Sequence, residues 1–108
     1  MKVIEGVLEE ELENSVRQEA AYIKELNAIP AGALVRKEIK GHAYYYIVLR
    51  EKGKVKFIYK GKISKDEVKK YEDAKEMRAK YRKLLSQVRK QISFLKKALH
   101  AKEIRSVS

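Results

Sequence analysis

The first quarter of the chain carries the hydrophobic spacing of an amphipathic helix. One face collects apolar residues at three- and four-residue intervals, with a gap at residues 19–20: Leu8, Leu12, Val16, Ile23 and Leu26. This spacing follows the helical period of 3.6 residues. Pro30 pushes the residue before it out of the helical region, so the helix is expected to end before Ile29. The pattern therefore predicts a helix over residues 1–28.

The middle of the chain changes to the two-residue alternation of β-strands. Three segments rich in β-branched and aromatic residues are separated by two short turns: residues 33–39, Lys40-Gly41, residues 43–50, Lys52-Gly53 and residues 54–60. Strands joined by two-residue turns that contain glycine form antiparallel hairpins. We therefore expect a three-stranded antiparallel β-meander over residues 33–61.

Two-residue turns also set the register of this meander. They pair Val35 with Tyr46 and Val48 with Phe57, and this register sorts the strand residues onto two faces. We call one the apolar face; it collects Val35, Ile39, Tyr44, Tyr46, Val48, Val55, Phe57 and Tyr59. We call the other the basic face; it collects Arg36, Tyr45, Ile47, Leu49, Lys54, Lys56, Ile58 and Lys60. The apolar residues on the basic face indicate that a helix or a partner chain covers part of it.

The last segment predicts one long helix over residues 64–102. Ser64 and Glu67 form the capping-box pattern that starts a helix, and no Gly or Pro follows. A heptad frame places Ala74, Tyr81, Val88 and Leu95 at position a, Met77, Leu84, Gln91 and Ala98 at d, and Leu85, Ile92 and Leu99 at e. The helix would be about 55 Å long, which is more than a three-stranded sheet can cover. We expect its far end to pack on the first helix as an antiparallel hairpin, or on a second copy in a coiled-coil dimer whose register Gln91 helps to set.

These elements predict an α+β fold in a single domain of 108 residues. The charge is segregated along the chain. The acidic helix 1–28 has a net charge of −4, residues 29–63 have +7 and residues 64–108 have +8, for a total of +11. A single domain this basic is typical of proteins that meet phosphate, in nucleic acid or on an anionic membrane.

A basic stripe marks the long helix. It consists of three pairs at seven-residue intervals: Arg82-Lys83, Arg89-Lys90 and Lys96-Lys97. Seven residues advance a helix by about 10.5 Å, so the pairs form a ladder opposite the apolar seam. Residues 77–102 hold nine bases and no acid, whereas a solvated helix usually interleaves glutamates. We predict that the basic stripe contacts phosphates; the alternatives are a solvated face and a face whose edge the acidic first helix neutralises.

The basic face of the sheet is the second candidate site. Its cations, together with one that follows the last strand, are Arg36, Lys54, Lys56, Lys60 and Lys62. They are interleaved with Tyr45, and basic and aromatic residues on a strand face suit contacts with phosphates, sugars and bases. Arg36 and Arg50 are candidates for contact with a base edge. The alternative is a solvated face whose lysines protect an edge strand from pairing.

Several classes of chemistry find no support in the sequence. The chain has no cysteine and two histidines, and its glycines match no phosphate-binding or dinucleotide-binding pattern. The tyrosines are typical strand residues. We therefore expect no enzyme activity, no metal site and no cofactor. No apolar run reaches the roughly 20 residues of a membrane span, and the start lacks a signal-peptide core, so we expect a cytoplasmic protein.

A resemblance is carried by residues 44–62, whose sequence is Tyr-Tyr-Tyr-Ile-Val-Leu-Arg-Glu-Lys-Gly-Lys-Val-Lys-Phe-Ile-Tyr-Lys-Gly-Lys, and by the Ser-capped helix that follows. Residues 33–82 resemble the arm-type DNA-binding domains of tyrosine recombinases. They also resemble short uncharacterised prokaryotic and mobile-element proteins with a Tyr-Tyr-Tyr…Arg…Gly-Lys…Tyr-x-Gly core. The resemblance to the arm-type domains implies a sheet, backed by a helix, that enters the major groove. It implies that DNA is faced by Arg36, Arg50, Lys54, Lys56 and Lys60. The catalytic domain of that family has no counterpart here, and both outer helices depart from its pattern.

Our expectation is a small, non-catalytic nucleic-acid-binding protein that favours double-stranded DNA over RNA and forms a homodimer. One alternative is a protein-interaction module, such as an antitoxin or an inhibitor of a nucleic-acid enzyme. That module would use the long helix and a patch of Tyr45, Ile47, Leu49 and Ile58. Another alternative is RNA binding, in which single-stranded bases stack on tyrosines. A membrane surface is the least favoured partner, because Trp is absent and Phe is scarce.

Overall fold

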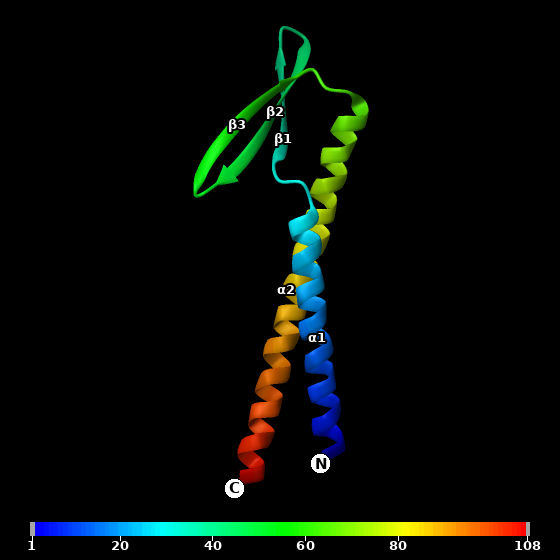
Figure 1. Cartoon of the computed structure of the whole chain (residues 1–108), viewed down its shortest axis with the longest axis vertical. Coiled ribbons are helices and arrows are strands. Elements are labelled where there is room, and N and C mark those ends of the chain that lie inside the picture. Colours follow the sequence, from blue (N-terminus) through cyan, green and yellow to red (C-terminus); the bar gives the residue numbers. More distant parts are fainter. Residues whose placement is uncertain (1, 108) are drawn as a thin grey trace. The chain divides into compact units, whose positions relative to one another are not determined.

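The computed structural model describes residues 2–107, with the side chains of residues 3–101 (Figure 1). Its elements are α1 (Lys2–Ala28), β1 (Ala33–Ile39), β2 (His42–Glu51), β3 (Lys54–Gly61) and α2 (Lys65–Val107). This confirms the predicted α+β fold, and α2 runs five residues past the predicted end at residue 102. The chain forms two compact units: a helical unit of α1 with the part of α2 from Lys80, and a sheet unit over residues 29–79.

The helical unit is an antiparallel hairpin within one chain. The rings of Tyr22 and Tyr81 pack at a tilt of 48° with centroids 6.0 Å apart, and Ser15 contacts Gln91. Residue numbers on α1 therefore rise in the direction in which those on α2 fall. The helices run alongside each other in Figure 1. Of the two arrangements expected for the far end of α2, packing on the first helix is therefore the one observed.

The core of the hairpin uses the a and e positions of α2. Leu85, Val88, Ile92 and Leu95 are buried. Partly buried residues of α1 pack against this cluster: Leu12, Tyr22 and Leu26. Gln91, at a d position, is exposed and donates a hydrogen bond of 3.0 Å to the buried Ser15. Gln91 thus ties the register of the hairpin inside one chain.

The sheet has the order β1-β2-β3 with antiparallel pairing. Val35 pairs with Tyr46 and Val48 with Phe57, as the turn lengths predict. Both residues of each turn have positive φ, for example 50° at Lys52 and 77° at Gly53. This is the backbone of a type I′ turn, whose twist matches that of the strands it joins.

The covered side of the sheet is the basic face, because Ile47 is only 5% exposed, whereas Phe57 and Tyr59 on the apolar face are 69% and 59% exposed. The segment before β1 provides part of the cover. A Cβ atom at Gly32 would lie 2.6 Å from Cγ2 of Ile47, so only glycine lets the backbone pass this close.

The start of α2 is tied to the same segment. Glu67 donates its backbone N–H to Oγ of Ser64 at 3.2 Å, which confirms Ser64 as the helix cap. Arg78 donates a 2.7 Å hydrogen bond to the carbonyl oxygen of Pro30. Within residues 2–107, no helix is long and apolar enough to cross a membrane.

Candidate nucleic-acid interface

The basic stripe lies on the exposed side of α2, where all six of its cations reach solvent. The helical period divides them into two rows. Lys83, Lys90 and Lys97 form the outward row, on the side away from the buried Val88 and Leu95. The flank row, beside the seam with α1, contains Arg82, Arg89 and Lys96. The predicted position opposite the apolar seam therefore holds for the outward row, whereas the flank row lies beside the seam, where Arg89 reaches Glu19 of α1.

One cation of the flank row is already paired. Nε of Arg89 lies 3.1 Å from Oε2 of Glu19, and the Arg89 side chain remains 57% exposed. The acidic helix thus neutralises the edge of the stripe at this one position. Among the side chains that the structure describes, no other cation of the stripe has a carboxylate within 4.0 Å.

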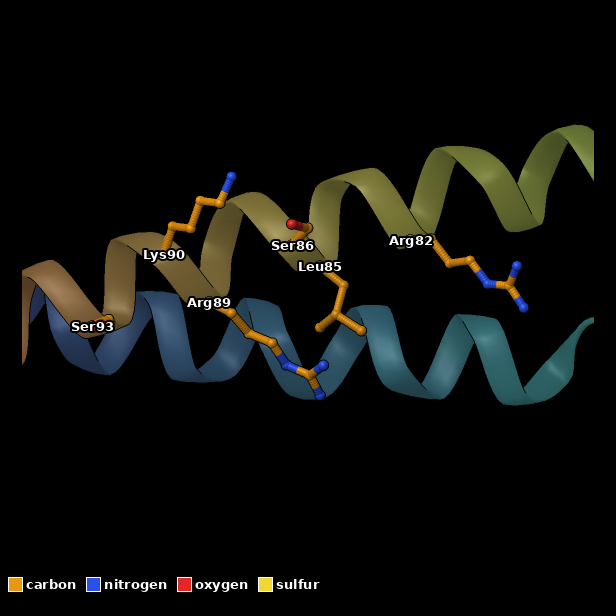
Figure 2. Close-up of a pocket in the computed structure, with 6 residues that line it drawn as sticks. All are labelled: Arg82, Leu85, Ser86, Arg89, Lys90 and Ser93. Atoms are coloured by element: carbon orange, nitrogen blue, oxygen red, sulfur yellow. The ribbon is translucent and has the colours of Figure 1, made fainter.

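A shallow hollow of about 480 Å³ runs along the flank row. Its lining residues are Arg82, Leu85, Ser86, Arg89, Lys90 and Ser93. Figure 2 shows both arginines on the same flank of α2, with Leu85 turned towards α1 and Lys90 turned away from it. Guanidinium and hydroxyl groups alternate along this row, and both are common donors to phosphate oxygens.

Sequence reasoning missed the two serines of this hollow. Ser86 follows Arg82 by four residues, and Ser93 follows Arg89 by four residues. That repeated spacing places each hydroxyl on the same helix face as an arginine, and it was the available signal. The hollow therefore adds two neutral hydrogen-bond donors to the predicted cations.

The basic face of the sheet is less positive than predicted. Arg36 forms an ion pair of 3.0 Å with Glu38, and Lys56 forms one of 3.1 Å with Glu51. Both carboxylates lie on this face, because Glu38 is two residues from Arg36 on β1 and Glu51 is two residues from Leu49 on β2. Lys54 is the remaining strand cation here, opposite Glu51 in the register.

The other three predicted residues are placed in different ways. Arg50 pairs with Val55 and lies on the apolar face, so it cannot face the same groove as Lys54. Lys60 is the unpaired residue of a β-bulge, since Tyr46 pairs with Tyr59 and Tyr45 with Gly61. Lys62 follows β3 and is exposed. The arrangement implied by the arm-type resemblance, with five cations on one face, is therefore wrong for this sheet.

The protein-binding patch proposed on the same face is also largely covered. Ile47 is buried, Tyr45 and Leu49 are half-buried, and Ile58 is 40% exposed. Apolar surface that is already packed inside the sheet unit is not available to a partner.

The apolar face presents an aromatic cluster that the sequence analysis did not single out as a site. The ring of Tyr59 lies 5.2 Å from that of Tyr46 and 6.5 Å from that of Tyr44, measured between centroids. These rings and Ile39 line a shallow hollow of about 540 Å³. Nζ of Lys37 lies 5.3 Å from the centroid of Tyr46, within cation–π distance.

Lys37 was missed because it interrupts an apolar alternation. Lys37 lies two residues from both Val35 and Ile39 on β1, so it shares their face of the sheet. This spacing was the available signal that a cation belongs to the apolar face. Elsewhere in residues 2–107, no group of three or more His, Cys, Asp or Glu residues could hold a metal ion.

A family model described as "Domain of unknown function (DUF6788)" matches residues 3–70. This segment contains most of α1, the whole sheet and the first turns of α2, and it ends before the basic stripe. No curated protein and no solved structure matches the chain.

Proposed function

The chain belongs to DUF6788, a family described as a domain of unknown function, and from its own surfaces we propose that it is a cytoplasmic, non-catalytic nucleic-acid-binding protein. Under this proposal, α2 holds the phosphate backbone of double-stranded DNA through the basic stripe. The observation that carries the proposal is the set of six exposed cations along α2, of which Arg89 alone has a carboxylate within 4.0 Å among the side chains that the structure describes.

The spacing of the stripe favours a regular polyanion. Its pairs repeat every seven residues on a rigid helix, which holds the cations about 10.5 Å apart along the axis. A duplex presents its phosphates at regular intervals, whereas an isolated acidic protein surface has no such regularity. Displacement of condensed counterions from the duplex supplies the free energy, so binding is steeply salt-dependent.

The hollow of the flank row supplies hydrogen bonds in addition to charge. Arg82 and Ser86 both line this hollow. A phosphate seated there accepts hydrogen bonds from both groups, which fixes its position on the helix. These contacts give register without reading base identity.

A variant of the outward row tests this proposal. We expect the triple change Lys83→Gln, Lys90→Gln and Lys97→Gln to weaken duplex DNA binding by about 100-fold near 0.1 M salt. We also expect the slope of log affinity against log salt to fall by about 3, because each lysine that contacts a phosphate contributes about 1. Fluorescence anisotropy with a labelled duplex measures both quantities, and unlabelled duplex RNA and single strands serve as competitors.

The matched control removes the same charge from the other end of the helix. Lys65, Lys69 and Lys75 are exposed lysines of α2 that have acidic neighbours. Their triple change to Gln lowers the net charge equally and is expected to leave the salt slope within about one unit. Equal losses in both triple variants would show that net charge alone drives binding and would reject the stripe as the site.

We also propose that the protein is a homodimer. A two-helix hairpin leaves apolar residues uncovered, and on α1 Val16 is 45% and Ile23 36% exposed. They lie seven residues apart on one flank of the helix, where a second hairpin would complete a four-helix core. Sedimentation equilibrium is expected to give twice the chain mass, and Val16→Glu is expected to give the monomer mass. A monomer mass for the unmodified protein at micromolar concentration would contradict the dimer.

A further inference from the structure

We propose that the apolar face of the sheet binds unpaired nucleotides of a single-stranded nucleic acid, whose bases stack on Tyr46, Phe57 and Tyr59. This inference rests on the proposed function and extends it to a second surface with a different ligand form. The alternative occupant, a second copy of the chain, is an outcome of the test below.

Aromatic residues of the apolar face are exposed on β3. Phe57 and Tyr59 are 69% and 59% exposed, and they lie two residues apart on β3. Tyr46, which is half-buried, pairs directly with Tyr59 on the neighbouring strand and lies 5.2 Å from its ring between centroids. Strands are about 4.8 Å apart and residues two apart on one strand are about 6.6 Å apart, so the rings form a platform wide enough for two or three stacked bases.

The apolar face carries positive charge. Its ionised side chains are Lys37 on β1 and Arg50 on β2, both cationic, while Glu38 and Glu51 alternate onto the basic face. An aromatic surface bordered only by cations complements a ligand with apolar ring faces and a negative backbone. Single-stranded nucleic acid has both properties, and binding by stacking together with phosphate contacts is its usual mode.

The same charges disfavour self-association through this face. In a two-fold dimer, both copies would use the same patch. Lys37 and Arg50 would then meet only cations across the interface, because the face carries no carboxylate within the strands. The arrangement of charge therefore favours a polyanion over a second copy.

Duplexes and single strands differ in whether their base faces are accessible to aromatic side chains. In a duplex the flat faces of the bases are stacked on one another and are closed to an aromatic side chain. Stacking on the exposed rings of Phe57 and Tyr59 requires bases that are free to unstack. Single strands are therefore the ligand form expected here, and the basic stripe remains the expected contact for duplexes.

The test measures binding of a labelled oligothymidylate of about 12 nucleotides, a length typical of single-strand sites. Phe57→Ala and Tyr59→Ala are each expected to weaken binding by about 5- to 100-fold, the range for loss of one stacked base. Tyr59→Phe keeps the ring and is expected to stay within about twofold. Both positions are exposed, so circular dichroism is expected to show an intact fold.

Phe94 offers a closely matched control, because it is 68% exposed and lies on α2 of the helical unit. Phe94→Ala is expected to change oligothymidylate binding by no more than about twofold. Since the chain has no tryptophan, Phe57→Trp and Phe94→Trp each place a single fluorophore at a defined site. Oligothymidylate is expected to quench the tryptophan at residue 57 and to leave that at residue 94 unchanged.

Three results would overturn the inference. They are equal oligothymidylate affinity of Phe57→Ala and the unmodified protein, absence of quenching at residue 57, and a sheet variant that lowers the sedimentation mass without changing oligonucleotide binding. The last result would assign the face to a second copy. Failure of the proposed function gives a different result. The stripe variants would then bind duplex DNA as well as the unmodified protein does, while the sheet variants would still weaken single-strand binding.

Discussion

At the scale of single residues, Glu19 controls how many cations of the stripe can meet a ligand. Its carboxylate lies 3.1 Å from Arg89, whose side chain is 57% exposed, while that of Glu19 is 30% exposed. Exposed pairs of this kind contribute only about 0.2–1 kcal/mol. A phosphate can therefore displace the carboxylate at small cost, and removal of the carboxylate makes Arg89 available without competition.

We expect Glu19→Gln to raise duplex DNA affinity by about two- to fivefold, which corresponds to the free energy of an exposed ion pair. The measurement is anisotropy at about 0.1 M salt. Glu25→Gln is the control, since Glu25 lies on the same helix, is exposed and gives the same change in net charge. An equal gain in the two variants would mean that the pair with Arg89 has no specific effect.

A second prediction at this scale concerns Gly32. We expect Gly32→Ala to lower the free energy of unfolding by about 1–3 kcal/mol, because the residue has a φ of 106° and its new Cβ would collide with Ile47. Urea denaturation gives the value. Gly53→Ala also has positive φ but meets open space, so it is expected to cost less. A smaller loss at Gly32 than at Gly53 would contradict the close packing described here.

At the scale of elements, periodicity predicts the helices and strands well, because each element is specified by its own residues. The register followed from the two turns. The covered side of the sheet did not, because it depends on where the segment around Gly32 passes, and that path has no signature in the strand alternation. The bulge at Lys60 likewise interrupts the pairing of β2 and β3, although the alternation of side chains in the sequence continues through it.

The turns provide the prediction for this scale. Lys52 has a φ of 50°, a left-handed conformation that lysine adopts at a cost and that asparagine tolerates. Lys52→Asn is therefore expected to stabilise the protein by about 0.5–1 kcal/mol. Thermal unfolding followed by circular dichroism checks this, with Lys62→Asn as a control for the lost charge. A lower midpoint for Lys52→Asn than for Lys62→Asn would contradict a type I′ turn.

For the whole molecule, the sequence predicted a basic protein with two candidate nucleic-acid surfaces. In the structure the basic stripe supports that prediction better than the basic face of the sheet does. The stripe keeps its cations exposed on α2. The basic face of the sheet loses charge to Glu38 and Glu51, and the aromatic cluster on the opposite face becomes the stronger candidate on the sheet unit. Residue composition alone did not show this, because ion pairing and ring exposure arise only once the strands are aligned.

The salt dependence of duplex DNA binding by the unmodified protein shows whether the stripe binds the phosphate backbone. Among the side chains of residues 3–101, five of the six stripe cations have no carboxylate within 4.0 Å, so the slope of log affinity against log salt is expected to be at least about −4 to −5, at about 0.9 per contact. This corresponds to a loss of about 10²- to 10³-fold between about 50 and 200 mM salt. A slope shallower than about −1, or no binding at micromolar protein at the lowest salt, would contradict the account.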